Sequence, residues 1–202
     1  LQLSADQPNA FIVARLNDVA PNGASTRVTY GVLNLTHRTS HEFPEPLMPG
    51  ETYETHLQLN DVAQGFPVGN RIRIALSNTM WPLFWPSPEL VTLMLKTEGS
   101  HLELPIRPPR ETDQSLRPFD PPESAEPQAA EELEPPSYTR LVERDDVLSE
   151  SRLTVVADTG MVRLTDLGWE HGSVSRQYYS IRDGDPNSAK IDLNWTMRFR
   201  RP

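Results

Sequence analysis

The chain contains no cysteine among its 202 residues. Disulfide bonds, thiolate nucleophiles and thiolate metal sites are therefore excluded. A cysteine-free composition is typical of a reducing compartment, so we predict a cytoplasmic location. The sequence does not begin with methionine, and no charged segment leads into an apolar signal core. It therefore offers no targeting motif.

Basic residues are also in short supply. The chain has 19 Lys and Arg against 28 Asp and Glu, which gives a formal net charge of -9 at pH 7. Nucleic acids and anionic membranes bind through basic patches, so we expect neither as a partner. No apolar run approaches the roughly 20 residues that a membrane-spanning helix needs. These features predict a soluble protein.

The chain lacks the Gly-x-Ser-x-Gly motif that places the nucleophile of an α/β-hydrolase on a strand-to-helix turn. The nearest approach is Gly-Ala-Ser-Thr-Arg at residues 23–27, which lacks the second glycine and lies in a predicted hairpin. We therefore predict no catalytic residue, and no enzymatic activity for this chain alone.

Two short patterns match metal sites only in part. His37, His41 and Glu42 have a spacing that zinc could use, but no cysteine and no helical His-Glu-x-x-His supports them. Residues 183–185, Asp-Gly-Asp, resemble the start of a calcium loop, yet Asn194 stands where a bidentate glutamate is required. We predict a strand end at His37, a plain turn at residues 183–185, and no metal or cofactor.

What the chain does contain is the period-two alternation of β-strands. Residues 21–23, Pro-Asn-Gly, predict a hairpin turn because Asn-Gly supplies the positive φ values that a tight turn demands. The apolar residues change parity near Gly31, which predicts a bulge there. After an alternating segment at residues 1–8, we predict strands at residues 11–19, 26–35, 51–60, 71–76, 90–95 and 102–106.

A proline-rich and acidic stretch divides the chain. Residues 105–136 hold most of the prolines outside the segment 80–89, together with the acidic run of Glu131, Glu132 and Glu134. Such a composition cannot build a core and predicts a linker or strap. Beyond it we predict strands at residues 138–145, 151–157, 161–167, 177–182 and 189–199.

The strand pattern predicts an all-β protein. Residues 1–107 are expected to form a jelly roll or β-sandwich, residues 108–137 the linker or strap, and residues 138–202 a second antiparallel β unit.

The last predicted strand alternates strictly and should be half-buried. Its apolar face consists of Ala189, Ile191, Leu193, Trp195, Met197 and Phe199. The sequence stops three residues later, and a flat unpaired edge would be prone to aggregate. We therefore expect the chain to belong to a longer polypeptide, with its second β unit truncated at the C-terminal end.

The segment 80–89 concentrates large aromatic rings between prolines. Three such rings would bury roughly 600 Å², worth on the order of 15 kcal/mol as an upper bound. They should therefore be packed against something. Either this loop folds onto its own sandwich, or it docks another domain or walls a ligand pocket. The candidate interface or pocket-lining residues are Trp81, Pro82, Phe84, Trp85 and Pro86.

Four segments in the right order resemble the C-terminal domain of the CocE/NonD family of serine hydrolases. They are residues 18–38, 47–59, 65–89 and 100–108. The family includes X-prolyl dipeptidyl-peptidase-like and cocaine-esterase-like enzymes. The resemblance covers about the first 108 residues, and the stretch after Tyr138 is similar to the β-rich tail of one bacterial branch. It implies a jelly roll, similar to galactose-binding-like domains, whose catalytic Ser, Asp and His lie in a preceding α/β-hydrolase domain.

The resemblance implies an accessory domain. It would be the non-catalytic C-terminal region of a serine hydrolase that acts on ester or amide (acyl) bonds, packing on the catalytic domain and helping to shape the acyl pocket. The expected partner is the N-terminal α/β-hydrolase domain of the same polypeptide, and a homo-oligomer is also open. The alternative is a free-standing carbohydrate-binding module of galactose-binding-like fold, in which exposed tryptophans stack on sugar rings.

Overall fold

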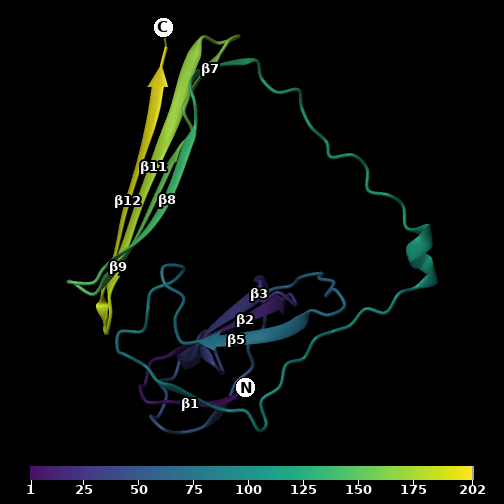
Figure 1. Ribbon diagram of the computed structural model, residues 1–202, viewed down its shortest axis with the longest axis vertical. Coiled ribbons are helices and arrows are strands. Elements are labelled where there is room, and N and C mark those ends of the chain that lie inside the picture. Colours follow the sequence, from purple (N-terminus) through teal and green to yellow (C-terminus); the bar gives the residue numbers. More distant parts are fainter. Residues whose placement is uncertain (202) are drawn as a thin grey trace. The chain divides into compact units, whose positions relative to one another are not determined.

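The computed structural model describes residues 1–201 and is almost entirely β (Figure 1). Two compact units divide the chain. The first holds Leu1–His101, Val142–Leu153 and Tyr179–Ile191, and the second holds Leu102–Leu141, Thr154–Tyr178 and residues from Asp192 onward. No helix within residues 1–201 has the length and apolar character needed to cross a membrane.

Two three-stranded antiparallel sheets form the sandwich of the first unit. One has the order β4-β1-β6 and the other the order β3-β2-β5. Their bounds are β1 Gln2–Ala5, β2 Phe11–Val19, β3 Ser25–Asn34, β4 Tyr53–Glu54, β5 Arg71–Ser77 and β6 Leu93–Lys96. A single 3-10 turn, η1, follows β3 at Leu35–His37. The predicted all-β sandwich is thereby confirmed.

Apolar residues from both sheets meet in one core. Leu3 and Ala5 of β1 pack with Ile12 of β2. Residues between the strands complete the buried cluster, namely Ala10, Leu35 and Leu47. Because successive side chains of a strand point to opposite faces, Ile12, Ala14 and Leu16 define the inner face of β2, and Phe11, Val13 and Arg15 its outer face.

The predicted strand at residues 51–60 is mostly wrong, since only Tyr53–Glu54 is paired as a strand. The backbone of Thr55 exchanges two 2.8 Å hydrogen bonds with Leu1, next to β1. Five residues further, Asn60 N donates to Tyr30 O on β3 at 3.0 Å. The segment therefore crosses from the edge of one sheet to the edge of the other. Its apolar and polar residues still alternate, but it forms no continuous hydrogen-bond ladder with a single strand.

The bulge predicted at Gly31 is also wrong. Gly31 pairs regularly with Ala14, and a Cβ there would lie 2.3 Å from Gln58 O, so the position needs glycine for space. The register shifts instead where Leu16 faces Thr29 and Asn17 faces Arg27, which leaves Val28 as the extra residue. A bulge reverses the parity of the strand beyond it.

No strand forms at residues 102–106, contrary to the prediction. The segment is exposed and belongs to no strand, and up to residue 129 the only regular element that follows it is the 3-10 turn η2, Glu111–Ser115 (Figure 1). Pro105, Pro108 and Pro109 lack the backbone N–H that a ladder requires. Alternation of Leu102, Leu104 and Ile106 was therefore not sufficient for a strand.

The third sheet has six strands. Its members are β7 Ala130–Glu134, β8 Ser137–Asp145, β9 Glu150–Asp158, β10 Met161–Leu164, β11 Trp169–Arg182 and β12 Asp185–Arg200. Strand β11 pairs with β10, β9 and β12, while β7 pairs with β10 and β8 with β9. Strand β7 lies inside the range expected to be a linker. Its glutamates showed no alternation, and its order comes from pairing with β10.

Strand β12 confirms the predicted strand at residues 189–199 but not its half-buried face. Leu193, Trp195, Met197 and Phe199 are all exposed. The residues of opposite parity are instead engaged within the sheet. Arg198 donates to Glu134 Oε2 at 2.8 Å, and Arg200 donates to Glu170 Oε2 at 2.6 Å.

A buried carboxylate organises one end of this sheet. The side chain of Glu170 on β11 is 4% exposed and accepts hydrogen bonds from Arg163 Nη2 at 2.7 Å and from Arg200. Glu131 of β7 contacts the same Arg163 at 2.8 Å. The Arg163 hydrogen bond, followed by that of Arg200, lowers the pKa of Glu170 below its ordinary value of 4.5 despite desolvation. Four strands, β7, β10, β11 and β12, are thus joined by one charge network.

The Glu170 network should make the folding stability depend on pH. Because the pKa of Glu170 is lowered in the folded chain, its stabilising contribution is complete above the ordinary pKa and is lost as the pH falls below 4.5 towards the lowered value. We expect Glu170→Gln to melt at a lower temperature than the parent at pH 7, and the difference to shrink towards pH 3. Thermal unfolding followed by circular dichroism measures this.

The matched control is Glu132→Gln, on an exposed residue of β7. It should follow the parent at both pH values. A deficit for Glu170→Gln that is equally large at pH 7 and pH 3 would show that the ion pairs are not its cause.

Candidate interface around the aromatic loop

The aromatic loop, residues 78–91, follows β5 and is closed at its base. Asn78 Nδ2 donates to Val91 O across that base. Within the loop, Leu83 N donates to Met80 O at 2.8 Å, around a cis peptide bond between Trp81 and Pro82. Short local hydrogen bonds therefore hold the segment in one conformation.

Phe84 anchors the aromatic loop to its own sandwich. Its ring lies 5.1 Å from that of Phe11, centroid to centroid, with the planes inclined at 48°. Phe11 belongs to the outer face of β2, on which the neighbouring Val13 is fully buried. An inclined pair at this separation is a favourable aromatic geometry. The loop thus lies against the side of the sheet that faces away from the core.

Trp85 is the exposed member of the three rings. It retains 54% of its surface, whereas Trp81 and Phe84 are half-buried. The Trp81 and Trp85 rings lie 5.2 Å apart and are inclined at 50°. Pro82 and Pro86 are half-buried on either side. The loop therefore combines an anchored phenyl ring with a tryptophan held out towards solvent.

A second segment of the first unit reaches the aromatic loop from far along the chain. The Tyr179 ring stands edge-on to Trp81, with centroids 6.4 Å apart and planes at 81°. Nearby, Asn187 Nδ2 donates to Pro88 O at 2.9 Å. These partners were not predicted from the sequence, because a contact between residues about a hundred positions apart leaves no local pattern in either segment.

The partial metal patterns remain poor ligand sets in the structure. Nδ1 of His37 lies 3.4 Å from Nδ1 of His41, and both belong to the segment around η1. Within residues 1–201 no three His, Asp or Glu side chains gather as a metal site would require. In the turn at residues 183–185, Asp183 pairs with Arg144, whose hydrogen bond lowers the pKa of this carboxyl. That carboxylate is engaged by a cation of the chain itself.

The residues closest to a nucleophile motif lie in a hairpin. Gly23 belongs to the β2–β3 turn, closed by a 2.9 Å bond from Ala20 N to Ala24 O, and Ser25 begins β3. This is a strand-to-strand turn and not the strand-to-helix elbow that exposes a hydrolase serine.

The fold defines the class as a β-sandwich domain. A model of the X-Pro dipeptidyl-peptidase C-terminal non-catalytic domain family matches residues 1–117. The chain belongs to this family, as the resemblance in its sequence predicted. Membership implies a catalytic domain on the N-terminal side as partner. No curated protein matches the chain significantly.

Two substitutions within the aromatic loop should separate its two roles. We expect Phe84→Ala to lower the free energy of unfolding by about 2 kcal/mol, because it removes a half-buried ring from the sheet. Trp85→Ala should cost about 1 kcal/mol or less, since it removes an exposed ring and one aromatic contact. Urea unfolding of this chain measures both. Equal losses would contradict the division into anchor and contact residue.

Proposed function

We propose that this chain is the non-catalytic C-terminal region of an α/β serine hydrolase of the CocE/NonD kind, which acts on ester or amide bonds. In this proposal the aromatic loop packs on the catalytic domain. Membership of a family of C-terminal non-catalytic domains supports it. The observation that carries it is the arrangement of Phe84 and Trp85, one ring fixed on the sandwich and the other turned outward.

The proposed contact rests on the physics of protein interfaces. Tryptophan and tyrosine supply most of the binding energy at such surfaces, because they bury a large area at little cost in side-chain entropy. The hydrogen bonds of Asn78 and Leu83 order the loop before docking, which lowers the entropy lost on association. A docked Trp85 would exchange its exposed half for contact with the catalytic domain.

We further propose that the aromatic loop helps to shape the acyl pocket of that enzyme. Trp81, Trp85 and the flanking Pro82 and Pro86 present a rigid apolar wall, as pocket linings commonly do. The wall would determine the size of the acyl group that fits the pocket, without taking part in bond cleavage. The triad itself would belong to the catalytic domain.

A carbohydrate-binding module would also use an exposed tryptophan such as Trp85. Such modules usually rely on calcium for support of the binding loops. The one calcium-like turn of this chain has Asp183 engaged with Arg144. We therefore favour the accessory domain.

The test uses the full polypeptide that carries both domains. Trp85→Ala should lower kcat/KM on p-nitrophenyl esters about tenfold, which corresponds to a loss of about 1.4 kcal/mol of transition-state stabilisation. The loss should differ between short and long acyl chains if the loop lines the pocket. Phe119→Ala, which removes a fully exposed ring from the strap, is the matched control.

Unchanged kinetics and unchanged domain unfolding in Trp85→Ala would overturn the proposal. A uniform loss over all acyl chain lengths would retain the docking role and remove the pocket-shaping role.

A further inference from the structure

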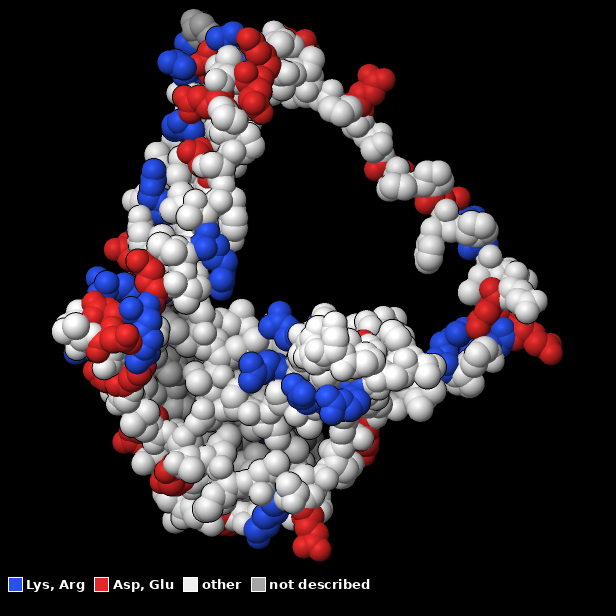
Figure 2. Space-filling view, in the orientation of Figure 1, with Lys and Arg blue, Asp and Glu red and all other residues white. Residues whose placement is uncertain are grey.

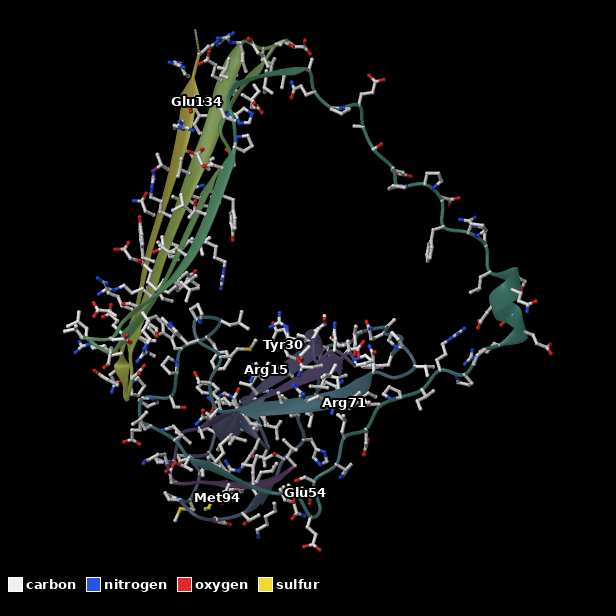
Figure 3. The ribbon with its side chains drawn as sticks, in the orientation of Figure 1. Arg15, Tyr30, Glu54, Arg71, Met94 and Glu134 are labelled. Atoms are coloured by element: carbon white, nitrogen blue, oxygen red, sulfur yellow. The ribbon has the colours of Figure 1, made fainter. Side chains whose placement is uncertain are left out.

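The outer face of sheet β3-β2-β5 carries a cluster of arginines beside the aromatic loop. The four residues, which we call the arginine face, are Arg15, Arg27, Arg71 and Arg73. Figure 2 shows Lys and Arg side chains gathered over these three strands. Figure 3 places Arg15 of β2 and Arg71 of β5 there, with Tyr30 on the neighbouring strand β3.

Strand register puts these side chains on one side of the sheet. Tyr30 of β3 pairs with Arg15 of β2, and paired residues point to the same face. Arg73 pairs with Asn17, two residues along β2 from Arg15, and Arg71 pairs with Val19, two residues further. Since Arg15, Asn17 and Val19 share the parity of Phe11, these side chains all lie on the outer face.

The bulge at Val28 adds the fourth arginine. Arg27 and Tyr30 are three residues apart and would point to opposite faces of a regular strand. The extra residue reverses the parity, so Arg27 pairs with Asn17 and its guanidinium lies 5.0 Å from the centre of the Tyr30 ring. Bulges often redirect a side chain in this way near functional surfaces.

The positive charge of this face is not neutralised. None of the four arginines has an ion-pair partner in residues 1–201. Arg15 donates only a long bond, 3.4 Å from Nη2 to Ser77 Oγ, and its buried Nε has no partner there. Strands β3 and β5 contain no Asp or Glu at all. Yet the whole chain has 28 acidic and only 19 basic residues.

We propose that the arginine face docks on a carboxylate-rich surface of the catalytic domain, as an extension of the aromatic-loop contact. This inference rests on the proposed function. Guanidinium groups fit carboxylates through paired, directional hydrogen bonds. Arginine beside exposed tryptophan and tyrosine is the composition of energetically important protein interfaces. The family implies a catalytic domain as neighbour, so the occupant is an acidic patch of that domain and not nucleic acid.

The experiment reverses the charge in the full polypeptide. Arg71→Glu combined with Arg73→Glu changes two exposed residues of β5, and the milder Arg71→Gln with Arg73→Gln removes their charge. Lys96→Glu, on the exposed part of β6, is the matched control. The readouts are kcat/KM and the unfolding temperature of the catalytic domain at about 0.1 M and about 1 M NaCl, where the Debye length is about 10 Å and about 3 Å.

We expect the charge reversal to lower the unfolding temperature of the catalytic domain by about 4 °C at low salt. Neutralisation should give about half of that shift, Lys96→Glu none, and high salt should bring parent and variants together. Variants that match Lys96→Glu would overturn the arginine face. If the charge variants have no effect but Trp85→Ala still uncouples the domains, the proposed function stands without the arginine face. If self-association accounts for the salt effect, the partner is a second copy and the inference fails.

Discussion

Strand β2 is the element on which both sides of the sandwich depend. One parity of its side chains builds the core through Ile12, and the other carries Phe11, Val13 and Arg15. Because β2 is the central strand of its sheet, its register with β3 and β5 fixes everything on the outer face. The aromatic loop is held there by Phe84 on Phe11, and the arginine face follows along the same strand. A change of register by one residue would exchange core and surface.

Two groups of arginines differ in their ion pairing. In the six-stranded sheet, Arg163, Arg198 and Arg200 are paired with carboxylates of neighbouring strands. On sheet β3-β2-β5, the bulge at Val28 brings Arg27 to Tyr30, and Arg27 has no ion-pair partner in residues 1–201. The acid of this sheet, Asp18 of β2, accepts a hydrogen bond from Asn70. Paired arginines are accounted for by the fold itself. For the uncompensated ones we propose a contact with the catalytic domain that a family of C-terminal non-catalytic domains implies.

The local sequence pattern predicted most strands, because the alternation on β2 and β5 is a property of neighbouring residues. It failed where pairing decides the outcome. Residues 51–60 alternate but cross between sheets, and β7 does not alternate but is paired. The spacing of apolar residues predicts a bulge at Gly31, but the glycine is there because a side chain would clash with Gln58. Spacing alone does not distinguish a glycine at a bulge from a glycine required by a close backbone contact. Tyr179 and the arginine face depend on register and on contacts distant in sequence, so only the structure brings them together.

We propose that the outer side of β2 and its neighbours is an interface with the catalytic domain. Hydrogen exchange measured by mass spectrometry, on this chain and on the full polypeptide, would detect that interface. We expect slower exchange in the full polypeptide for peptides covering residues 71–77 and 80–89, with little change for β6 at residues 93–96. Equal exchange of the first two segments in both samples would contradict it.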